Sequence, residues 1–207
     1  MMVELHDPVV ALMRQVGRDI VMPRYQNLAA EEISEKAAND FVTIADKESE
    51  IRLAEGLASI LPEAGVIGEE ACAADPSILD RAGDGLNWII DPIDGTVAYM
   101  KGKPWWCIPI AIVEDGRPVA AVIHAPALGE TFTATLGGGA ALQEVIGRNA
   151  RNLGPDAGIV VLNLMVVPDG DAGGDGVQAL QVGVGAVQGV AVAIARQRCR
   201  FFEVVGA

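Results

Sequence analysis

Acidic residues gather in three short segments, each at the end of a predicted strand or the start of a predicted helix. The segments are residues 42–46 (VTIAD), 67–70 (IGEE) and 88–96 (WIIDPIDGT). Carboxylate oxygens suit hard cations such as Mg²⁺, which takes oxygen ligands in octahedral geometry and keeps some of its waters. The three segments together indicate a site for a divalent cation.

The third segment has the most specific pattern. Pro92 fixes its own φ and lacks an N–H donor, so Asp91 and Asp94 on either side of it can converge on one side of the turn. The carbonyl of Ile93 can point the same way. With Glu69 from the second segment, these groups form a suitable ligand set for Mg²⁺.

The same segment offers a place for an anion. Gly95 and Thr96 begin a predicted helix, where free backbone N–H groups and the helix dipole can hold a phosphate. The chain has 28 acidic and 15 basic residues, a net charge of −13, and would repel a phosphate ester unless bound metal ions reversed the local charge. A capped turn is the alternative interpretation, but the two upstream acidic segments favour a metal-assisted phosphate site.

Composition excludes several other classes of protein. With 207 residues, 51% hydrophobic and 21% charged, the chain is typical of a globular protein. The acidic balance argues against nucleic-acid and membrane partners, and no apolar run reaches the ~18 residues of a spanning helix. The N-terminus does not resemble a signal peptide, and Cys72, Cys107 and Cys199 are widely spaced. We therefore expect a cytoplasmic protein with reduced thiols.

The elements that must position the acidic residues are two helices followed by clustered strands. Asp7 is the predicted cap of the first helix, and a Glu-Asp-Gly-Arg turn indicates a hairpin. Residues 31–40 are expected to form a loop or an exposed edge, and 73–85 a polar loop. The order of elements predicts a layered α+β core. Helices are expected at 6–25 and about 45–61, and strands at 41–43, 66–67, 86–90, 106–113, 118–123 and 130–136.

In order and spacing, residues 40–46 (DFVTIAD), 67–71 (IGEEA) and 88–96 (WIIDPIDGT) resemble the inositol monophosphatase family of Mg²⁺-dependent, Li⁺-sensitive phosphatases. The resemblance runs from residue 6 to about residue 139. It implies an α/β fold, the αβαβα sandwich of the inositol monophosphatase and fructose-bisphosphatase type, and a homodimer. Family members act on inositol phosphates, histidinol phosphate, fructose bisphosphate or phosphoadenosine nucleotides.

The resemblance also implies metal ligands. Glu69, Asp91 and the carbonyl of Ile93 would bind the first Mg²⁺. Asp91 and Asp94 would bind the second, with Asp91 as the bridge, and Asp94 would also contact the phosphate. Two or three Mg²⁺ per site are expected in the family.

The remaining implied roles concern the phosphate and the attacking water. Gly95 and Thr96 would hold the phosphate. Thr96 and Asp46 would orient the water, with Glu70 in support, and Lys36 lies on the loop that closes over the metals in the family. The implied activity is hydrolysis of a phosphomonoester by metal-activated water.

The C-terminal third departs from the family's pattern. The family has a Trp-Asp motif there whose Asp binds the second metal, but this chain has no Trp after Trp106. We therefore divide the chain into a phosphatase core with the metal site at 1–139 and a divergent segment at 140–207, which leaves the C-terminal half of the fold incomplete. That segment is a truncated or frame-shifted substitute, or else a shortened variant with a different substrate lid. We expect a weakened second Mg²⁺ site and low or absent turnover.

Three functions follow as alternatives. The first is a Mg²⁺-dependent phosphomonoesterase for a small phosphorylated metabolite similar to inositol monophosphate. The second is a non-catalytic pseudo-phosphatase that binds metal and dimerises. The third is a histidinol-phosphate or bisphosphate-nucleotide phosphatase of the same family.

Overall fold

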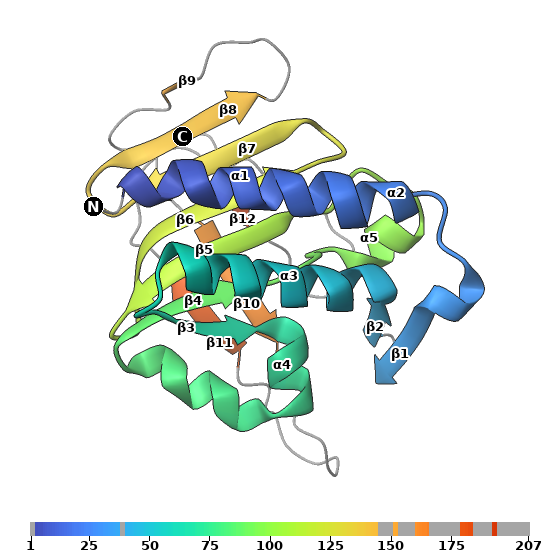
Figure 1. Ribbon diagram of the computed structural model, residues 1–207, viewed down its shortest axis with the longest axis horizontal. Helices are drawn as coiled ribbons and strands as arrows, with labels where there is room; N and C mark the ends of the chain where they lie inside the picture. The colour runs from blue at the N-terminus through green and yellow to red at the C-terminus, as the bar shows by residue number, and fades with distance from the viewer. Residues whose placement is uncertain are drawn as a thin grey trace.

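A seven-stranded sheet, in the order β3-β4-β5-β6-β7-β8-β9, is the centre of the fold (Figure 1). The computed structural model describes residues 3–37, 40–144, 151–152, 160–165, 179–183 and 192–193. The segment predicted to diverge, 140–207, and the proposed Cys199 thiol therefore lie largely or wholly outside the described residues. The strands are β3 Gly65–Gly68, β4 Leu86–Ile90, β5 Ile108–Glu114, β6 Arg117–Ala125, β7 Glu130–Thr135, β8 Gly139–Glu144 and β9 Arg151–Asn152.

Strand direction in this sheet decides where the acidic segments meet. β3 and β4 are parallel, with Gly68 opposite Ile90, and every later pair is antiparallel. The hairpin predicted between β5 and β6 is confirmed, since Asp115 and Gly116 both have positive φ, at 48° and 74°, as its tight turn requires. The carboxyl ends of β3 and β4 therefore lie side by side, and the residues that follow them share one edge of the sheet.

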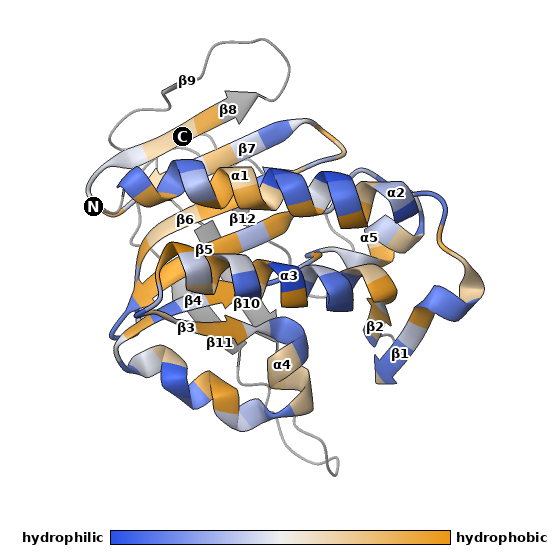
Figure 2. Cartoon of the chain, viewed as in Figure 1, coloured by the Kyte–Doolittle hydropathy of each residue, from blue (hydrophilic) through white to orange (hydrophobic). Residues whose placement is uncertain are grey.

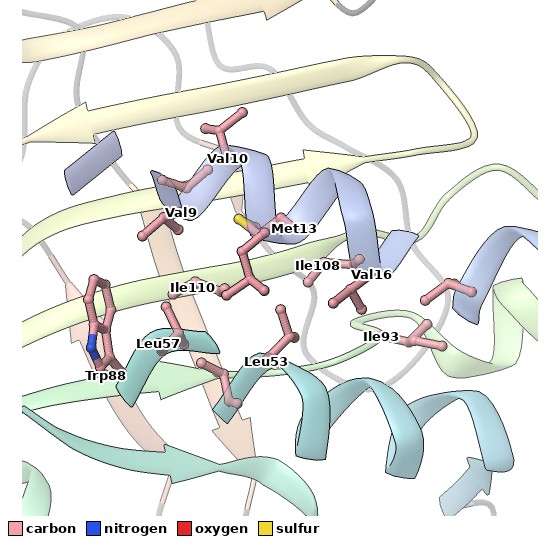
Figure 3. Packing of buried hydrophobic residues seen from close by; sticks show 14 of the residues in the cluster. Val9, Val10, Met13, Val16, Leu53, Leu57, Trp88, Ile93, Ile108 and Ile110 are labelled. Carbon is pink, nitrogen blue, oxygen red and sulfur yellow. The ribbon is translucent and has the colours of Figure 1, made fainter. Parts of the chain in front are cut away.

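Two helices cover one face of the sheet: α1 His6–Val16 and α3 Ile44–Ile60 (Figure 1). Figure 2 shows hydrophobic colour along β4, β5 and β6 and a mixture of colours on both helices, as expected for helices with one buried side. Side chains from α1, α3 and the sheet pack together in Figure 3. Fully buried members of this cluster include Met13, Leu53, Leu57, Ile90, Ile93, Ile108 and Ile110.

Several local expectations need correction. The helix predicted at 6–25 changes geometry, because a π-helical turn at Gly17–Val21 joins α1 to α2, Met22–Arg24. Asp7 is not its cap but lies inside α1, which follows a 3₁₀ turn at Val3–Leu5. The loop expected at 73–85 contains a 3₁₀ helix, Pro76–Gly83. Short elements of this kind form through tertiary contacts more than through their own sequence preference.

Five further strands belong to the described structure. β1 Ile33–Ala37 lies where a loop or exposed edge was expected, and β2 Asp40–Thr43, its antiparallel partner, confirms the strand predicted at 41–43. A three-stranded sheet, β11-β10-β12, has β10 Val160–Met165 and β11 Ala179–Gly183 against β5 and β6; β12 is Val192–Ala193. The predicted layered α/β class is confirmed. None of the described helices has the length and apolar character that a bilayer crossing requires.

His124 of β6 is a titratable group inside this fold. Its side chain is 4% exposed, and its Nδ1 lies 3.2 Å from the carbonyl oxygen of Glu130 and 3.0 Å from Oγ1 of Thr131. Nδ1–H must donate to the carbonyl, because a carbonyl oxygen has no hydrogen to give. Burial lowers the pKa of His124 to about 4, although the hydrogen bond to Glu130 opposes that shift.

We predict that His124 makes the protein less stable in mild acid. Between pH 6.5 and pH 4 the unfolded chain binds a proton at this side chain that the folded chain does not, so stability is lost as the pH falls. The free energy of unfolding should drop by about 2 kcal/mol from pH 7 to pH 5 through this group. Urea unfolding at several pH values would measure it. His124→Asn, which keeps a donor but cannot be protonated, should lack this contribution, and parallel curves for the two proteins would contradict the prediction.

Candidate metal and phosphate site

The parallel pair β3 and β4 places two acidic segments next to each other. Glu69 directly follows β3 and begins α4, Glu69–Ala74, while Asp91 directly follows β4. The side chain of Glu69 is close enough to Asp91 to raise the pKa of Asp91. Two residues 22 positions apart are thus brought together by strand pairing.

The carboxylates of Glu69, Asp91 and Asp94 form one electrostatic cluster. Burial first, and then the charges of Glu69 and Asp94, raise the pKa of Asp91 well above its ordinary value. Burial and the charge of Glu69 raise the pKa of Asp94 to about 7. Three of the residues that the sequence predicted as metal ligands are therefore close enough for the charge of Glu69 to raise the pKa values of Asp91 and Asp94.

Backbone hydrogen bonds to β5 fix the Asp91–Asp94 turn. The N–H of Asp91 donates to the carbonyl of Pro109 at 3.2 Å, and Asp94 and Cys107 exchange two N–H donations at 2.9 and 3.0 Å. Within the turn, the N–H of Ile93 donates to Oδ1 of Asp91 at 3.0 Å. The fully buried side chain of Ile93 anchors the turn in the core (Figure 3). The turn is thus fixed by backbone hydrogen bonds to the neighbouring segment and by the buried side chain of Ile93.

Gly95 is required by the backbone of the same turn. It has φ 93°, and a Cβ at this position would lie 2.8 Å from the carbonyl oxygen of Trp105. Gly95 precedes α5, Thr96–Met100. A residue with a side chain would meet both an unfavourable φ and a backbone oxygen that has little freedom to move.

Asp46 and Thr96 also come together, as the sequence predicted. Asp46 lies in the first turn of α3 and is 1% exposed; its Oδ2 accepts from the N–H of Thr43 at 2.9 Å and from the hydroxyl of Thr43 at 2.5 Å. The hydroxyl oxygen of Thr96 lies 3.0 Å from the carbonyl of Ile93 and 3.4 Å from Oδ1 of Asp46. Burial raises the pKa of Asp46 to about 7. Asp46 is buried and Thr96 partly buried, and the charges of Glu69 and Glu70 contribute to the raised pKa of Asp46.

Lys36 of β1 provides a positive charge at the cluster. Its Nζ donates to Oε1 of Glu69 at 3.2 Å and to Oε1 of Glu70 at 3.0 Å. Burial disfavours the ammonium, but the charges of Glu69 and Glu70 outweigh that effect and raise the pKa of Lys36. Glu70 is therefore held by an ion pair beside the predicted metal ligands.

The chemistry of the donor set fits a hard cation, although the side chains are not closed around one point. Across the described part of the chain, no three Asp, Glu, His or Cys side chains converge closely enough to share an ion. Glu69, Asp91, Asp94 and the carbonyl of Ile93 are nonetheless all oxygen donors. Asp91 and Asp94 have raised pKa values partly because neighbouring carboxylates repel them, a repulsion that a divalent cation would relieve.

Glu50 belongs to the same region and was not identified from the sequence. It lies on α3, is 8% exposed, and accepts from the N–H of Glu70 at 2.7 Å and of Ala71 at 2.8 Å. A signal was present: Asp46, Glu50, Leu53 and Leu57 recur at helical spacing, so two acids share the helix face with two core leucines. Acidic side chains on a helix face that is predicted to lie in the core indicate that these side chains have a functional role inside the protein.

Comparisons with known proteins agree with this geometry. The sequence model of the Inositol monophosphatase family matches residues 2–162, beyond the boundary predicted at residue 139. The protein named Nus factor SuhB from Escherichia coli (strain K12) is 34% identical over 142 residues, which are 68% of this chain and 51% of that protein. The chain spans about half the length of the curated relatives it matches.

Two solved structures show the same fold. One is the extragenic suppressor protein SuhB from Bartonella henselae, with a TM-score of 0.56 and 30% identity over 67% of this chain and 52% of that chain. The other is an IMPase from Thermotoga maritima, with a TM-score of 0.56 and 31% identity over 66% of this chain and 50% of that chain. The layered arrangement predicted from the sequence is therefore shared with solved structures of this kind.

We predict that Gly95→Ala destabilises the protein far more than Gly85→Ala does. Both glycines have positive φ, at 93° and 64°, but a Cβ at Gly85 would meet nothing within 4 Å. Gly85→Ala should cost about 1 kcal/mol of backbone strain, and Gly95→Ala about 1–3 kcal/mol more because of the clash with Trp105. Urea unfolding of the two variants would measure the difference, and equal losses would show that the close backbone approach is unimportant.

Proposed function

We propose a function for this chain, which belongs to the inositol monophosphatase family: the Mg²⁺-dependent hydrolysis of a small phosphate monoester. The observation that carries the proposal is the clustering of Glu69, Asp91 and Asp94 at one sheet edge, beside the pair of Asp46 and Thr96. Because the chain spans about half of its curated relatives, the activity of the whole protein is part of the proposal.

The proposed metal ligands are the oxygens at the carboxyl ends of β3 and β4. Glu69, Asp91 and the carbonyl of Ile93 would hold one Mg²⁺, and Asp91 and Asp94 a second. Bound Mg²⁺ would activate a water molecule and neutralise phosphate charge. The chain itself contributes rigidity, because the turn is hydrogen-bonded to β5 and anchored in the core.

Asp46 and Thr96 are the proposed pair that orients the attacking water. The hydroxyl of Thr96 can donate to Oδ1 of Asp46 and so leave its oxygen free to accept a hydrogen from water. Two hydrogen bonds from the N–H and the hydroxyl of Thr43 hold Asp46 in place, and both are accepted by Oδ2, so Oδ1 remains available to Thr96. The proposed role of Glu70 is to support this pair from its position beside Glu69.

The proposed substrate is a small phosphorylated metabolite similar to inositol monophosphate. Its phosphate would lie against Gly95 and Thr96, with Asp94 in contact. Gly95 has no side chain there to obstruct an anion. Since the net charge is −13, the anion depends on bound cations for attraction. We further propose a homodimer in the cytoplasm, and low turnover because the family's Trp-Asp motif is absent.

A second candidate is a non-catalytic metal-binding protein. Its support is that curated relatives carry the name Nus factor SuhB and that Lys36 pairs with Glu69 and Glu70. Metal stoichiometry separates the candidates. Two Mg²⁺ per chain with phosphate release would support the phosphatase, and one Mg²⁺ without release would support the non-catalytic protein.

We predict slow, Mg²⁺-dependent phosphate release from inositol monophosphate by the purified chain. Asp91→Asn should weaken Mg²⁺ binding by more than ~100-fold, because even partners outside the ligand set contribute ~10–100-fold to metal affinity. Calorimetric Mg²⁺ titration and a phosphate-release assay would measure both effects. Asp80→Asn, at an exposed aspartate of the 3₁₀ helix, is the matched control. Equal Mg²⁺ binding by wild type and Asp91→Asn would refute the proposed site.

A further inference from the structure

We infer that Glu50 is a positioning residue for the metal site: from α3 it fixes the backbone that carries Glu69. This inference rests on the proposed function, because it assigns Glu50 a role in presenting a metal ligand. Glu50 lies 19 positions before Glu69 and accepts hydrogen bonds from backbone N–H groups of the segment that Glu69 begins.

The carboxylate of Glu50 binds the start of α4. Its Oε2 accepts from the N–H of Glu70 at 2.7 Å, and its Oε1 accepts from the N–H of Ala71 at 2.8 Å. N–H groups in the first turn of a helix have no partner within that helix. The residue before α4 is Gly68, which has no side chain to cap it. Glu50 therefore supplies from another helix the cap that the local sequence lacks.

Gly68 is shaped to receive this carboxylate. Its φ is −104°, which any residue can adopt, so its own backbone does not demand glycine. A Cβ at Gly68 would instead overlap the carboxylate carbon and both oxygens of Glu50. The two residues thus form an interlock in which the missing side chain makes room for the capping group.

The interlock also links two parts of the proposed site. Asp46 and Glu50 are four residues apart on α3, so they project from the same side of the helix. Asp46 contacts Thr96, and Glu50 holds the segment that carries Glu69. Since α4 has only six residues, it cannot hold its own first turn firmly. Glu50 therefore fixes Glu69 relative to the pair of Asp46 and Thr96.

Glu50→Gln tests the inference in the full chain, with Mn²⁺ as the probe metal. A Gln amide has one oxygen acceptor where the carboxylate has two, so one of the two N–H donations should be lost. Mn²⁺ affinity, measured by electron paramagnetic resonance, should fall by ~10–100-fold. Hydrogen exchange at the amides of Glu70 and Ala71 should become faster in the metal-free chain. Glu55→Gln, at an exposed position of the same helix, should change neither quantity.

Gly68→Ala separates position from charge. It displaces the carboxylate of Glu50 but leaves its charge in the protein, so a positioning role predicts a loss of Mn²⁺ affinity similar to that of Glu50→Gln. In a Glu50→Ala background, where the obstacle is gone, Gly68→Ala should cause little further loss. Urea unfolding of every variant would verify that it remains folded, and only folded variants enter the comparison of affinities.

Three outcomes would overturn the inference. Wild-type Mn²⁺ affinity in folded Glu50→Gln would show that Glu50 only stabilises α4. Normal affinity in Gly68→Ala, together with weak binding in Glu50→Gln, would assign the effect to charge instead of position. No Mn²⁺ binding by the unaltered chain would contradict the proposed function itself, and this failure is recognisable because it does not involve Glu50.

Discussion

Mutual repulsion between carboxylates that are partly or fully buried at the ends of β3 and β4 is the constraint on which the proposed site depends. Burial and neighbouring charges raise the pKa values of Asp91 and Asp94, so their ionised forms are disfavoured where the fold holds them. Such an arrangement is costly unless opposite charge is close by. Lys36 supplies one positive charge to this group through Glu69, and a divalent cation would supply more. The hydrogen bonds and ion pairs around these carboxylates hold the like-charged side chains close together.

An aromatic cluster includes Tyr99 of α5, the helix that begins at Thr96 in the proposed phosphate site. The ring of Tyr99, from α5, lies 5.8 Å from that of Tyr25 and 5.1 Å from that of Trp106, edge-on in the second case. The hydroxyl of Tyr99 donates to the carbonyl of Val21 at 2.8 Å, in the π-helical turn after α1. The irregular end of the N-terminal helical region is therefore hydrogen-bonded directly to the helix that begins at Thr96. Packing on one face of the sheet thus restrains the position of the proposed phosphate-binding segment at its edge.

Features specified by neighbouring residues could be predicted from the sequence, and features specified by distant partners could not. The Asp91–Asp94 turn and the β5–β6 hairpin follow from local Pro and Gly chemistry, and the amphipathic helices from periodicity. α4 was missed because its cap, Glu50, comes from another helix. The ion pairs of Lys36 and the encounter of Asp46 with Thr96 depend on chain segments dozens of residues apart; for the latter, only resemblance to known sequences indicated the pairing.

The position of β3 in the sheet explains why the two halves of the ligand set are held by different means. β4 has β5 as its next neighbour, so the turn after β4 can use backbone groups of Pro109 and Cys107. Among the described strands, β3 lies at the edge of the sheet and pairs only with β4, so no described strand lies beyond it to hydrogen-bond the segment that follows it. A helix start in that position leaves unpaired N–H groups, and a carboxylate from the covering helix is the natural acceptor. The N–H groups after β3 therefore need an acceptor from outside the described sheet, and Glu50 provides it. The placement of Glu69, a proposed metal ligand, thus depends on a side chain of the covering helix.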